Sequence, residues 1–166
     1  YYTKKPELKL RFPPDRSSSP RLRPAPVSIA VPSSTAEADP AERRALVVDD
    51  EPTIRSAVAR YLRRRGWQAD EAEDGRAALS KLGRAGVNGY QAVVSDLRMP
   101  NCSGVELHDW LAEHRPDLFA RLIITTGDLA SPAWRSFIAR TPRPLIEKPF
   151  ELPVLAQLIE AVARGR

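Results

Sequence analysis

From Ala45 onward, short strand-like runs alternate with longer segments whose apolar residues recur at helical spacing. The strand-like runs are ALVV, WQADE, AVVS, RLIIT and PLIE. Short runs of this kind predict strands, whereas apolar residues three, four and seven positions apart predict one face of a helix. The pattern therefore predicts five strands, each followed by a helix.

Caps and spacing delimit the predicted helices. Asp74 is well placed to cap a second helix that runs to about Arg84, and Gly104 opens the third. The apolar positions that mark the first, third, fourth and fifth helices are, in that order, Ile54, Val58, Tyr61 and Leu62; Leu107, Trp110 and Leu111; Trp134, Phe137 and Ile138; and Leu155, Leu158, Ile159 and Val162.

This alternation predicts an α/β fold of the (βα)5 type, a doubly wound parallel sheet with helices on both faces. The crossovers in such a sheet are right-handed. Ligands of these sheets bind at the carboxyl ends of the strands, next to the point where the strand order reverses. Residues directly after the strands are therefore the first candidates for a functional site.

The N-terminal part of the chain has a different composition. Seven of the sixteen prolines lie between Pro13 and Pro40, together with six serines and no glycine. Such a segment has too few apolar residues to build a core, so residues 13–43 are predicted to be a disordered linker. Ahead of it, ELKLRFPP alternates apolar and charged residues, which predicts a strand within residues 1–12.

Composition and charge exclude several classes of protein. The net charge is +5, but residues 1–44 hold nine Lys/Arg against five Asp/Glu, so +4 of it belongs to the tail. No concentrated basic stripe appears, so we expect no specific nucleic-acid binding. There is no apolar run of membrane-spanning length or signal peptide, and Cys102 is the only cysteine. A cytoplasmic segment without membrane contact is expected.

Polar residues follow four of the predicted strands. They are Asp49 and Asp50 after the first strand, Asp96 at the third, Thr126 at the fourth and Lys148 at the fifth. Three carboxylates in one crevice repel each other unless a cation joins them. Oxygen ligands without His or Cys favour a hard ion, so the sequence predicts a Mg2+ site.

The remaining groups suit phosphoryl chemistry. Lys148 can neutralise an anion held by the metal, and the hydroxyl of Thr126 can donate to it. A carboxylate can attack phosphorus and form an aspartyl-phosphate. Asp96 is the expected nucleophile, because the Asp49 and Asp50 pair is best used on the metal. The alternative for that pair is a structural one, as acids favoured by the dipole at a helix N-terminus.

Four motifs, LVVDDE, SDLRMPNCSG, TTGD and EKPF, occur in this order and together resemble the receiver domain of two-component response regulators. The resemblance covers residues 44–164 and implies the flavodoxin-like receiver fold. It implies that Asp96 accepts a phosphoryl group from a phosphohistidine, and that the aspartyl-phosphate later undergoes self-catalysed hydrolysis. The implied donor is a histidine kinase or a histidine phosphotransfer protein.

The same resemblance assigns the other site residues. It implies that Asp50, Asp96 and the backbone carbonyl of Arg98 bind Mg2+, with Asp49 assisting through water. Thr126 and Lys148 are implied to bind the phosphoryl oxygens, and the peptide between Lys148 and Pro149 is implied to be cis.

The last third of the domain is similar to receivers fused to the C-terminus of hybrid histidine kinases. In that case residues 1–12 are the final strand of the kinase's ATP-binding domain. The alternative is a stand-alone response regulator with an N-terminal extension. Receivers often carry Tyr or Phe where this chain has Leu145, so signalling through an aromatic rotamer is not expected. A weak dimer would use the fourth and fifth helices.

A haloacid-dehalogenase-like phosphatase is the rival from another class, since it also uses an Asp nucleophile, Mg2+ and Lys. Its first strand is followed by Asp, any residue, Asp, any residue and Thr. DDEPT supplies Asp49, Glu51 and Thr53, so Glu replaces the second Asp.

Three further side chains receive structural interpretations. His108 and His114 lie on the third predicted helix, outside the crevice, and are expected to be surface histidines. Cys102 lies in the NCSG loop and is expected to be an exposed thiol.

Overall fold

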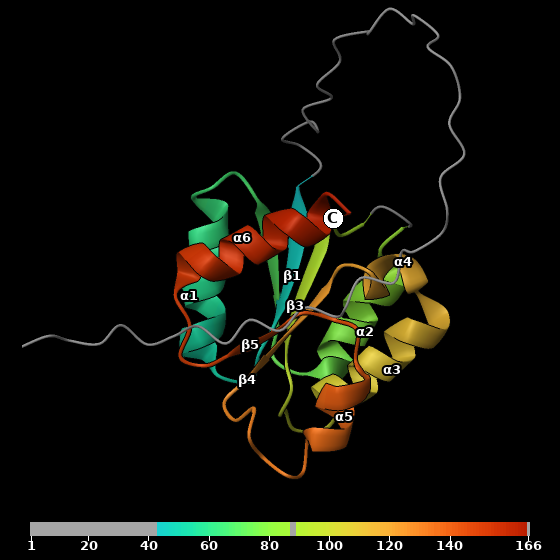
Figure 1. Ribbon diagram of the computed structural model, residues 1–166. Helices are drawn as coiled ribbons and strands as arrows, with labels where there is room; N and C mark the ends of the chain where they lie inside the picture. Colours follow the sequence, from blue (N-terminus) through green and yellow to red (C-terminus); the bar gives the residue numbers. More distant parts are fainter. Residues whose placement is uncertain (1–42, 87–88, 166) are drawn as a thin grey trace, which may run out of the picture.

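The computed structural model describes residues 43–86 and 89–165. The predicted strand in residues 1–12 lies outside the described residues, and so does the predicted linker at 13–43, apart from Arg43. The described part forms one parallel sheet between two layers of helices (Figure 1).

The sheet has five parallel strands in the order β2-β1-β3-β4-β5, which confirms the predicted doubly wound α/β fold. From β1 the chain moves outward to β2 and then returns to β3 on the other side of β1. The strand order therefore reverses between β1 and β3, which is where a ligand is expected. The strands are β1 Arg44–Val48, β2 Gln68–Ala72, β3 Ala92–Asp96, β4 Leu122–Thr126 and β5 Leu145–Glu147.

Helices cover both faces of the sheet. The helices α1 and α6 lie on one face, and α2, α3, α4 and α5 lie on the other (Figure 1). The short α4 was not predicted; Pro116 stands at its first position, where a missing N–H costs nothing. The helices are α1 Pro52–Arg63, α2 Gly75–Arg84, α3 Gly104–His114, α4 Pro116–Phe119, α5 Arg135–Arg140 and α6 Leu152–Ala163.

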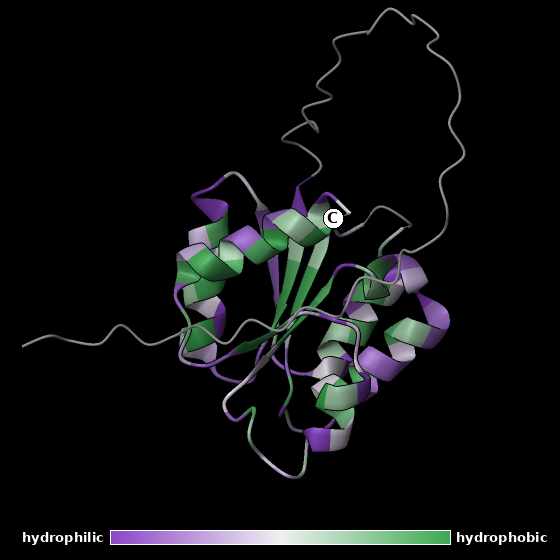
Figure 2. Ribbon diagram, in the orientation of Figure 1, coloured by the Kyte–Doolittle hydropathy of each residue, from purple (hydrophilic) through white to green (hydrophobic). Residues whose placement is uncertain are grey.

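Each strand contributes to two cores, because successive side chains of a strand point to opposite faces. Val47 packs with α1 and α6, whereas its neighbour Leu46 packs with the helices of the other face. Both side chains are at most 2% exposed, and burial of each stabilises the fold by roughly 1.5 to 3 kcal/mol. Figure 2 shows the central strands mostly in green, whereas the helices carry green, white and purple residues.

Two helix starts next to the sheet's carboxyl end are capped as their sequences suggest. The Asp74 carboxylate accepts a hydrogen bond from the Ala77 backbone N–H at 2.7 Å, and α2 ends at Arg84 as predicted. At the start of α3, Ser103 and Glu106 form a reciprocal capping box. These caps fix where the loops after β2 and β3 end.

The surface expectations for two side chains were wrong. His108 is only 4% exposed and lies between the edges of the Phe119 and Phe137 rings. The sequence reading missed its burial because α4 was not predicted and α5 was not placed against α3. Cys102 is 9% exposed, because its loop folds back against Gly75 at the start of α2.

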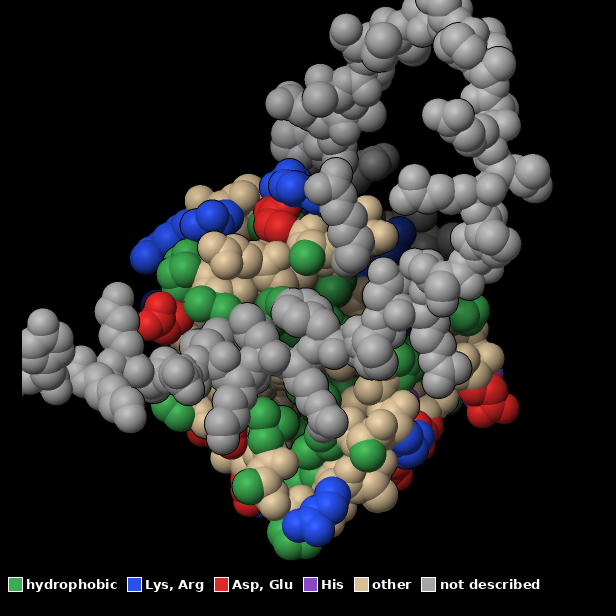
Figure 3. All heavy atoms as spheres, viewed as in Figure 1, with side chains coloured by type: hydrophobic (Ala, Val, Ile, Leu, Met, Phe, Trp, Pro, Cys, Tyr) green, Lys and Arg blue, Asp and Glu red, His purple; other side chains and the backbone are tan. Residues whose placement is uncertain are grey.

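On the face seen in Figure 3, charged side chains lie in separate groups. Figure 3 shows blue and red side chains around the rim of one face, without a continuous basic stripe among the described atoms.

No helix within residues 43–86 and 89–165 is long and apolar enough to span a bilayer.

Candidate functional site

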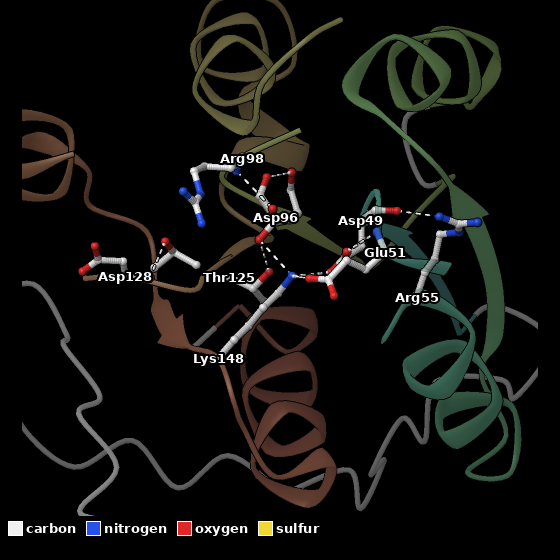
Figure 4. Close-up of polar contacts among 10 residues, drawn as sticks. Asp49, Glu51, Arg55, Asp96, Arg98, Thr125, Asp128 and Lys148 are labelled. Carbon is white, nitrogen blue, oxygen red and sulfur yellow. Dashed lines mark hydrogen bonds and ion pairs between the residues drawn. The ribbon is translucent and has the colours of Figure 1, made fainter. Parts of the chain in front are cut away.

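The loop after β1 carries the first two carboxylates. Asp49 is 3% exposed, whereas Asp50 is exposed. The Asp49 backbone N–H donates to the Ala72 carbonyl at 3.1 Å, which extends the β1–β2 ladder by one residue. Its carboxylate accepts from the Glu51 backbone N–H at 2.9 Å, and its carbonyl accepts from Nη1 of Arg55 at 2.6 Å (Figure 4). The carboxylate of Asp49 is thereby held at the strand end.

Asp96 is the last residue of β3 and is 5% exposed. Its Oδ2 accepts from the Arg98 backbone N–H at 3.1 Å, and its Oδ1 lies 3.5 Å from the hydroxyl donor of Thr125. The start of α3 presses against the backbone here: a Cβ on Gly104 would lie 2.1 Å from the Asp96 carbonyl oxygen. Only glycine permits this close approach of helix and strand.

Lys148 connects the two buried carboxylates. Its Nζ lies 2.8 Å from Oδ2 of Asp49 and 3.1 Å from Oδ1 of Asp96. Glu51 is a third partner, at 3.5 Å. In Figure 4 the lysine side chain reaches from the end of β5 to a point between the two aspartates. The peptide between Lys148 and Pro149 is cis, as the resemblance implied.

Negative charge exceeds positive charge in this group of side chains. Burial raises the pKa of Asp96 above its ordinary value, against the attraction of Lys148, and the Asp49 charge adds to the rise. Burial acts to lower the pKa of Lys148, but its hydrogen bond to Asp49 and the charge of Asp96 outweigh burial and raise that pKa. The lysine therefore stays protonated, and one ammonium group serves three carboxylates.

The two threonines at the end of β4 point in different directions, as neighbours on a strand do. Thr125 directs its hydroxyl at Asp96. The hydroxyl of Thr126 instead accepts from the Asp128 backbone N–H at 3.3 Å, within the loop that follows β4. The structure therefore places Thr126 beside the crevice with its hydroxyl engaged in the loop.

An open cavity of about 580 Å³ lies over these strand ends. Asp96 and Lys148 reach its floor, and both are mostly buried. The residues that line it are Asp50, Glu51, Asp96, Arg98, Met99, Ser103, Gly127, Trp134 and Lys148.

The donor set of this cavity suits a hard cation. Within the described residues, no three His, Cys, Asp or Glu side chains converge closely enough to hold a metal by themselves. Mg2+ usually takes only one or two protein carboxylates and completes its shell with water and phosphate oxygens. Asp50 and Asp96 line one cavity and have no His or Cys among its lining neighbours, so the residues present fit Mg2+.

Most of the predicted site residues meet in one place. Asp49, Asp96 and Lys148 are in direct contact, and Asp50 and Arg98 line the adjoining cavity. Their chemical roles stay predictions.

Sequence reasoning missed three neighbours of the site. Arg55 left no signal, because it contacts a backbone carbonyl. The doublet of Thr125 and Thr126 was a usable signal, since both hydroxyls lie at the carboxyl end of β4. Trp134 was interpreted only as a packing residue, yet it also lines the cavity.

Comparison with known proteins identifies the class. Residues 45–160 match the sequence model of the response regulator receiver domain. The receiver of TrrA from Thermotoga maritima, solved in complex with Mg(2+)-BeF, superposes with a TM-score of 0.60 at 30% identity, over 72% of this chain and 98% of that one. The signal receiver domain of a histidine kinase from Syntrophus aciditrophicus gives 0.63 at 28% identity, over 74% and 91%.

Two curated relatives are larger proteins. The sensor protein EvgS of Escherichia coli K12 is 35% identical over 100 residues, which are 56% of this chain and 8% of EvgS. The transcriptional regulatory protein ResD of Bacillus subtilis is 41% identical over 66 residues, which are 40% of this chain and 26% of ResD. The matched segment thus corresponds to a small part of either relative.

This chain belongs to the response regulator receiver domain family, the receivers of two-component phosphorelay signalling. Receivers interact with histidine kinases or phosphotransfer proteins. Nothing in the fold or the comparisons favours the haloacid-dehalogenase-like phosphatase.

Proposed function

We propose that Asp96 accepts a phosphoryl group from a phosphohistidine of a partner protein. A carboxylate oxygen of Asp96 forms a bond to phosphorus while the P–N bond of the donor breaks. The electron pair of that bond returns to the imidazole nitrogen. Because the other ring nitrogen of the phosphohistidine carries a proton, the donor leaves as neutral histidine. The observation that carries the proposal is the buried Asp96 carboxylate, 3.1 Å from the Lys148 ammonium, at the point where the strand order reverses.

Lys148 stabilises the charge that moves onto the site. Its ammonium already contacts the Asp96 oxygen, so it can follow the negative charge from the carboxylate to the phosphoryl oxygens. Thr126 is proposed to donate its hydroxyl hydrogen to the same oxygens. Its hydroxyl oxygen accepts from the Asp128 N–H, and this bond leaves the hydrogen available. Thr125 already holds the acceptor carboxylate in place.

The proposed cation is Mg2+, held by Asp50, Asp96 and the backbone carbonyl of Arg98, with Asp49 acting through water. When bound, it supplies positive charge to the carboxylates and to the phosphoryl oxygens. Support comes from the Asp50 and Asp96 carboxylates in a cavity lining that holds no His or Cys, and from the Mg(2+)-BeF complex of TrrA.

The receiver is proposed to span residues 44–164 within a hybrid histidine kinase, after an ATP-binding domain that ends in residues 1–12 and a linker at 13–43. The similarity to EvgS and to the Syntrophus kinase receiver supports this parent, whereas ResD supports a response regulator. The reading frame upstream of this segment decides between them. A cytoplasmic location, a histidine kinase or phosphotransfer donor, and a weak dimer through α5 and α6 complete the proposal.

Labelling with a small phosphodonor tests the acceptor. With acetyl phosphate and Mg2+, the wild-type chain should take up one acid-labile phosphoryl group, and Asp96→Asn should take up none. Asp70→Asn is the matched control, because Asp70 is a carboxylate of β2 that pairs with Arg44 at the amino end of β1 and does not line the cavity. Labelling that survives in Asp96→Asn, or is lost in Asp70→Asn at full folding, contradicts the assignment.

A further inference from the structure

The cavity above Asp96 is larger than the reaction centre alone requires. Volumes from about 300 Å³ upward accommodate small organic ligands, and this one measures about 580 Å³. A phosphoryl group with a hydrated cation at the floor leaves much of that space unfilled. Part of the donor itself can therefore enter the cavity with the phosphoryl group.

The residues that line the cavity differ in chemistry. Asp50 and Glu51 contribute exposed carboxylates. Trp134 and Met99 contribute an indole and a thioether, which provide apolar surface. Trp134 is the only aromatic side chain among the lining residues.

The reaction geometry directs the donor's ring toward the cavity mouth. In an in-line transfer the leaving nitrogen lies on the opposite side of phosphorus from the attacking oxygen. Because Asp96 is 5% exposed and lies at the floor, the leaving imidazole must lie above it, nearer to solvent. Trp134 and Met99 line the cavity and are both more exposed than Asp96.

The indole is held in place before any donor arrives. Both Trp134 and Met99 pack against the second core, beneath the helices α2 to α5. The backbone of Trp134 is fixed by hydrogen bonds, its N–H donating to Ser131 at 3.1 Å and its carbonyl accepting from Ile138 at 2.8 Å. A fixed aromatic wall gives a contact at low entropic cost.

We propose that Trp134, with Met99, forms the wall against which the imidazole ring of the phosphohistidine donor packs, so that Trp134 is a specificity-determining residue for phosphohistidine. This inference rests on the proposed function, because it requires a phosphoryl group to arrive at Asp96 on an imidazole. The contact energy of an aromatic pair corresponds to a rate difference of about two- to ten-fold. The wall acts on the ring alone, so donors without a ring gain nothing from it.

Two small phosphodonors that break the same kind of bond distinguish the effect of the ring from the effect of the bond that reacts. Monophosphoimidazole and phosphoramidate both transfer phosphorus from nitrogen, but only the first carries a ring. The labelling rate of the full chain would be measured with each donor, and the ratio of the two rates compared between variants. Trp134→Leu removes the ring but keeps apolar bulk, and Trp134→Phe keeps a ring. Trp110→Leu is the control, since Trp110 packs against the same core and does not line the cavity.

The wild type is expected to prefer monophosphoimidazole, and Trp134→Leu should lower the rate ratio by about two- to ten-fold. Trp134→Phe and Trp110→Leu should keep it. An unchanged ratio in Trp134→Leu overturns the proposal. If that variant fails to fold, Met99→Ala decides, because it opens the same wall from the loop after β3 and should lower the ratio as well. A wild type labelled by neither donor refutes the proposed function instead.

Discussion

The two ends of the sheet both hold buried or half-buried charges, but they balance them differently. At the amino end, Arg44 and Asp70 form one ion pair with Tyr90 as an added donor. At the carboxyl end, the single ammonium of Lys148 serves Asp49, Asp96 and Glu51. The first arrangement is complete, whereas the second has an excess of negative charge.

At the amino end, the carboxylate of Asp70 is paired with a cation and hydrogen-bonded by neighbouring residues. Nε and Nη2 of Arg44 donate to the same Asp70 oxygen at 3.0 and 2.7 Å, and the Tyr90 hydroxyl donates to it at 2.8 Å. Burial raises the pKa of Tyr90 to about 12, together with the bond to Asp70. Burial also acts to raise the pKa of Asp70, but the bonds from Tyr90 and Arg44 outweigh it and lower that pKa. The folded state therefore favours the ionised carboxylate.

The carboxyl end is not satisfied, since the pKa of Asp96 is raised by burial despite the nearby ammonium. Ionised Asp96 is thus a cost to the folded state. The difference teaches that the Arg44–Asp70 pair stabilises the fold, whereas the strand ends keep an excess of negative charge that suits the cation proposed above.

Removal of Lys148 should break the carboxyl end most severely. Lys148→Met keeps an unbranched apolar side chain but leaves Asp49 and Asp96 without a cation, so the free energy of unfolding should fall by about 3 kcal/mol. Urea denaturation measures it, and millimolar Mg2+ should restore part of the loss. The exposed Lys81 provides the control, because Lys81→Met should change stability by under about 0.5 kcal/mol. If Lys148→Met and Lys81→Met lost the same free energy of unfolding, Lys148 would not have the special role assigned to it at the carboxyl end.

Neutralising the acceptor should have the opposite sign. Without Mg2+, Asp96→Asn should raise the free energy of unfolding by about 1 to 2 kcal/mol, since a costly buried charge disappears while Lys148 keeps Asp49 and Glu51. The same denaturation experiment detects it. A destabilised Asp96→Asn protein would mean that the carboxylate at this end is as well satisfied as Asp70.

At the amino end the effect should be smaller and depend on pH. Asp70→Asn should lower stability by about 1 kcal/mol at neutral pH, a value reduced by solvent because the Asp70 side chain is 33% exposed. Its folded-state pKa is lowered, so the contribution is present above the unfolded-state pKa of about 3.9 and is lost as pH falls through the folded-state pKa. Denaturation at neutral pH and below pH ~4 should show the variant and wild type converging. A stability difference between wild type and Asp70→Asn that grows as pH falls would contradict the lowered pKa of Asp70.

The sequence predicted the sheet well because every strand except β2 contains a short apolar run, and helical periodicity separates the strands. Asp74 and Arg84 bounded α2 as predicted, since a cap and a last turn are local features. The strand-end rule placed Asp49, Asp96 and Lys148 together without any knowledge of distances.

The rest depended on tertiary contacts. His108 is buried only because α4 and α5 pack against α3, and α4 has four residues and little periodicity. Arg55 reaches a backbone carbonyl, which leaves no pattern in the sequence. Trp134 has the spacing of a core residue and lines the cavity as well, a double role that periodicity does not reveal.

Borohydride trapping tests the central claim most directly, because it reduces an aspartyl-phosphate to homoserine at the residue that carried the phosphoryl group. The chain would be phosphorylated with Mg2+ present, reduced, digested and sequenced by mass spectrometry. The account predicts homoserine at Asp96 and at no other aspartate. Homoserine at Asp49 or Asp50, or none in a chain that has demonstrably taken up phosphate, would contradict it.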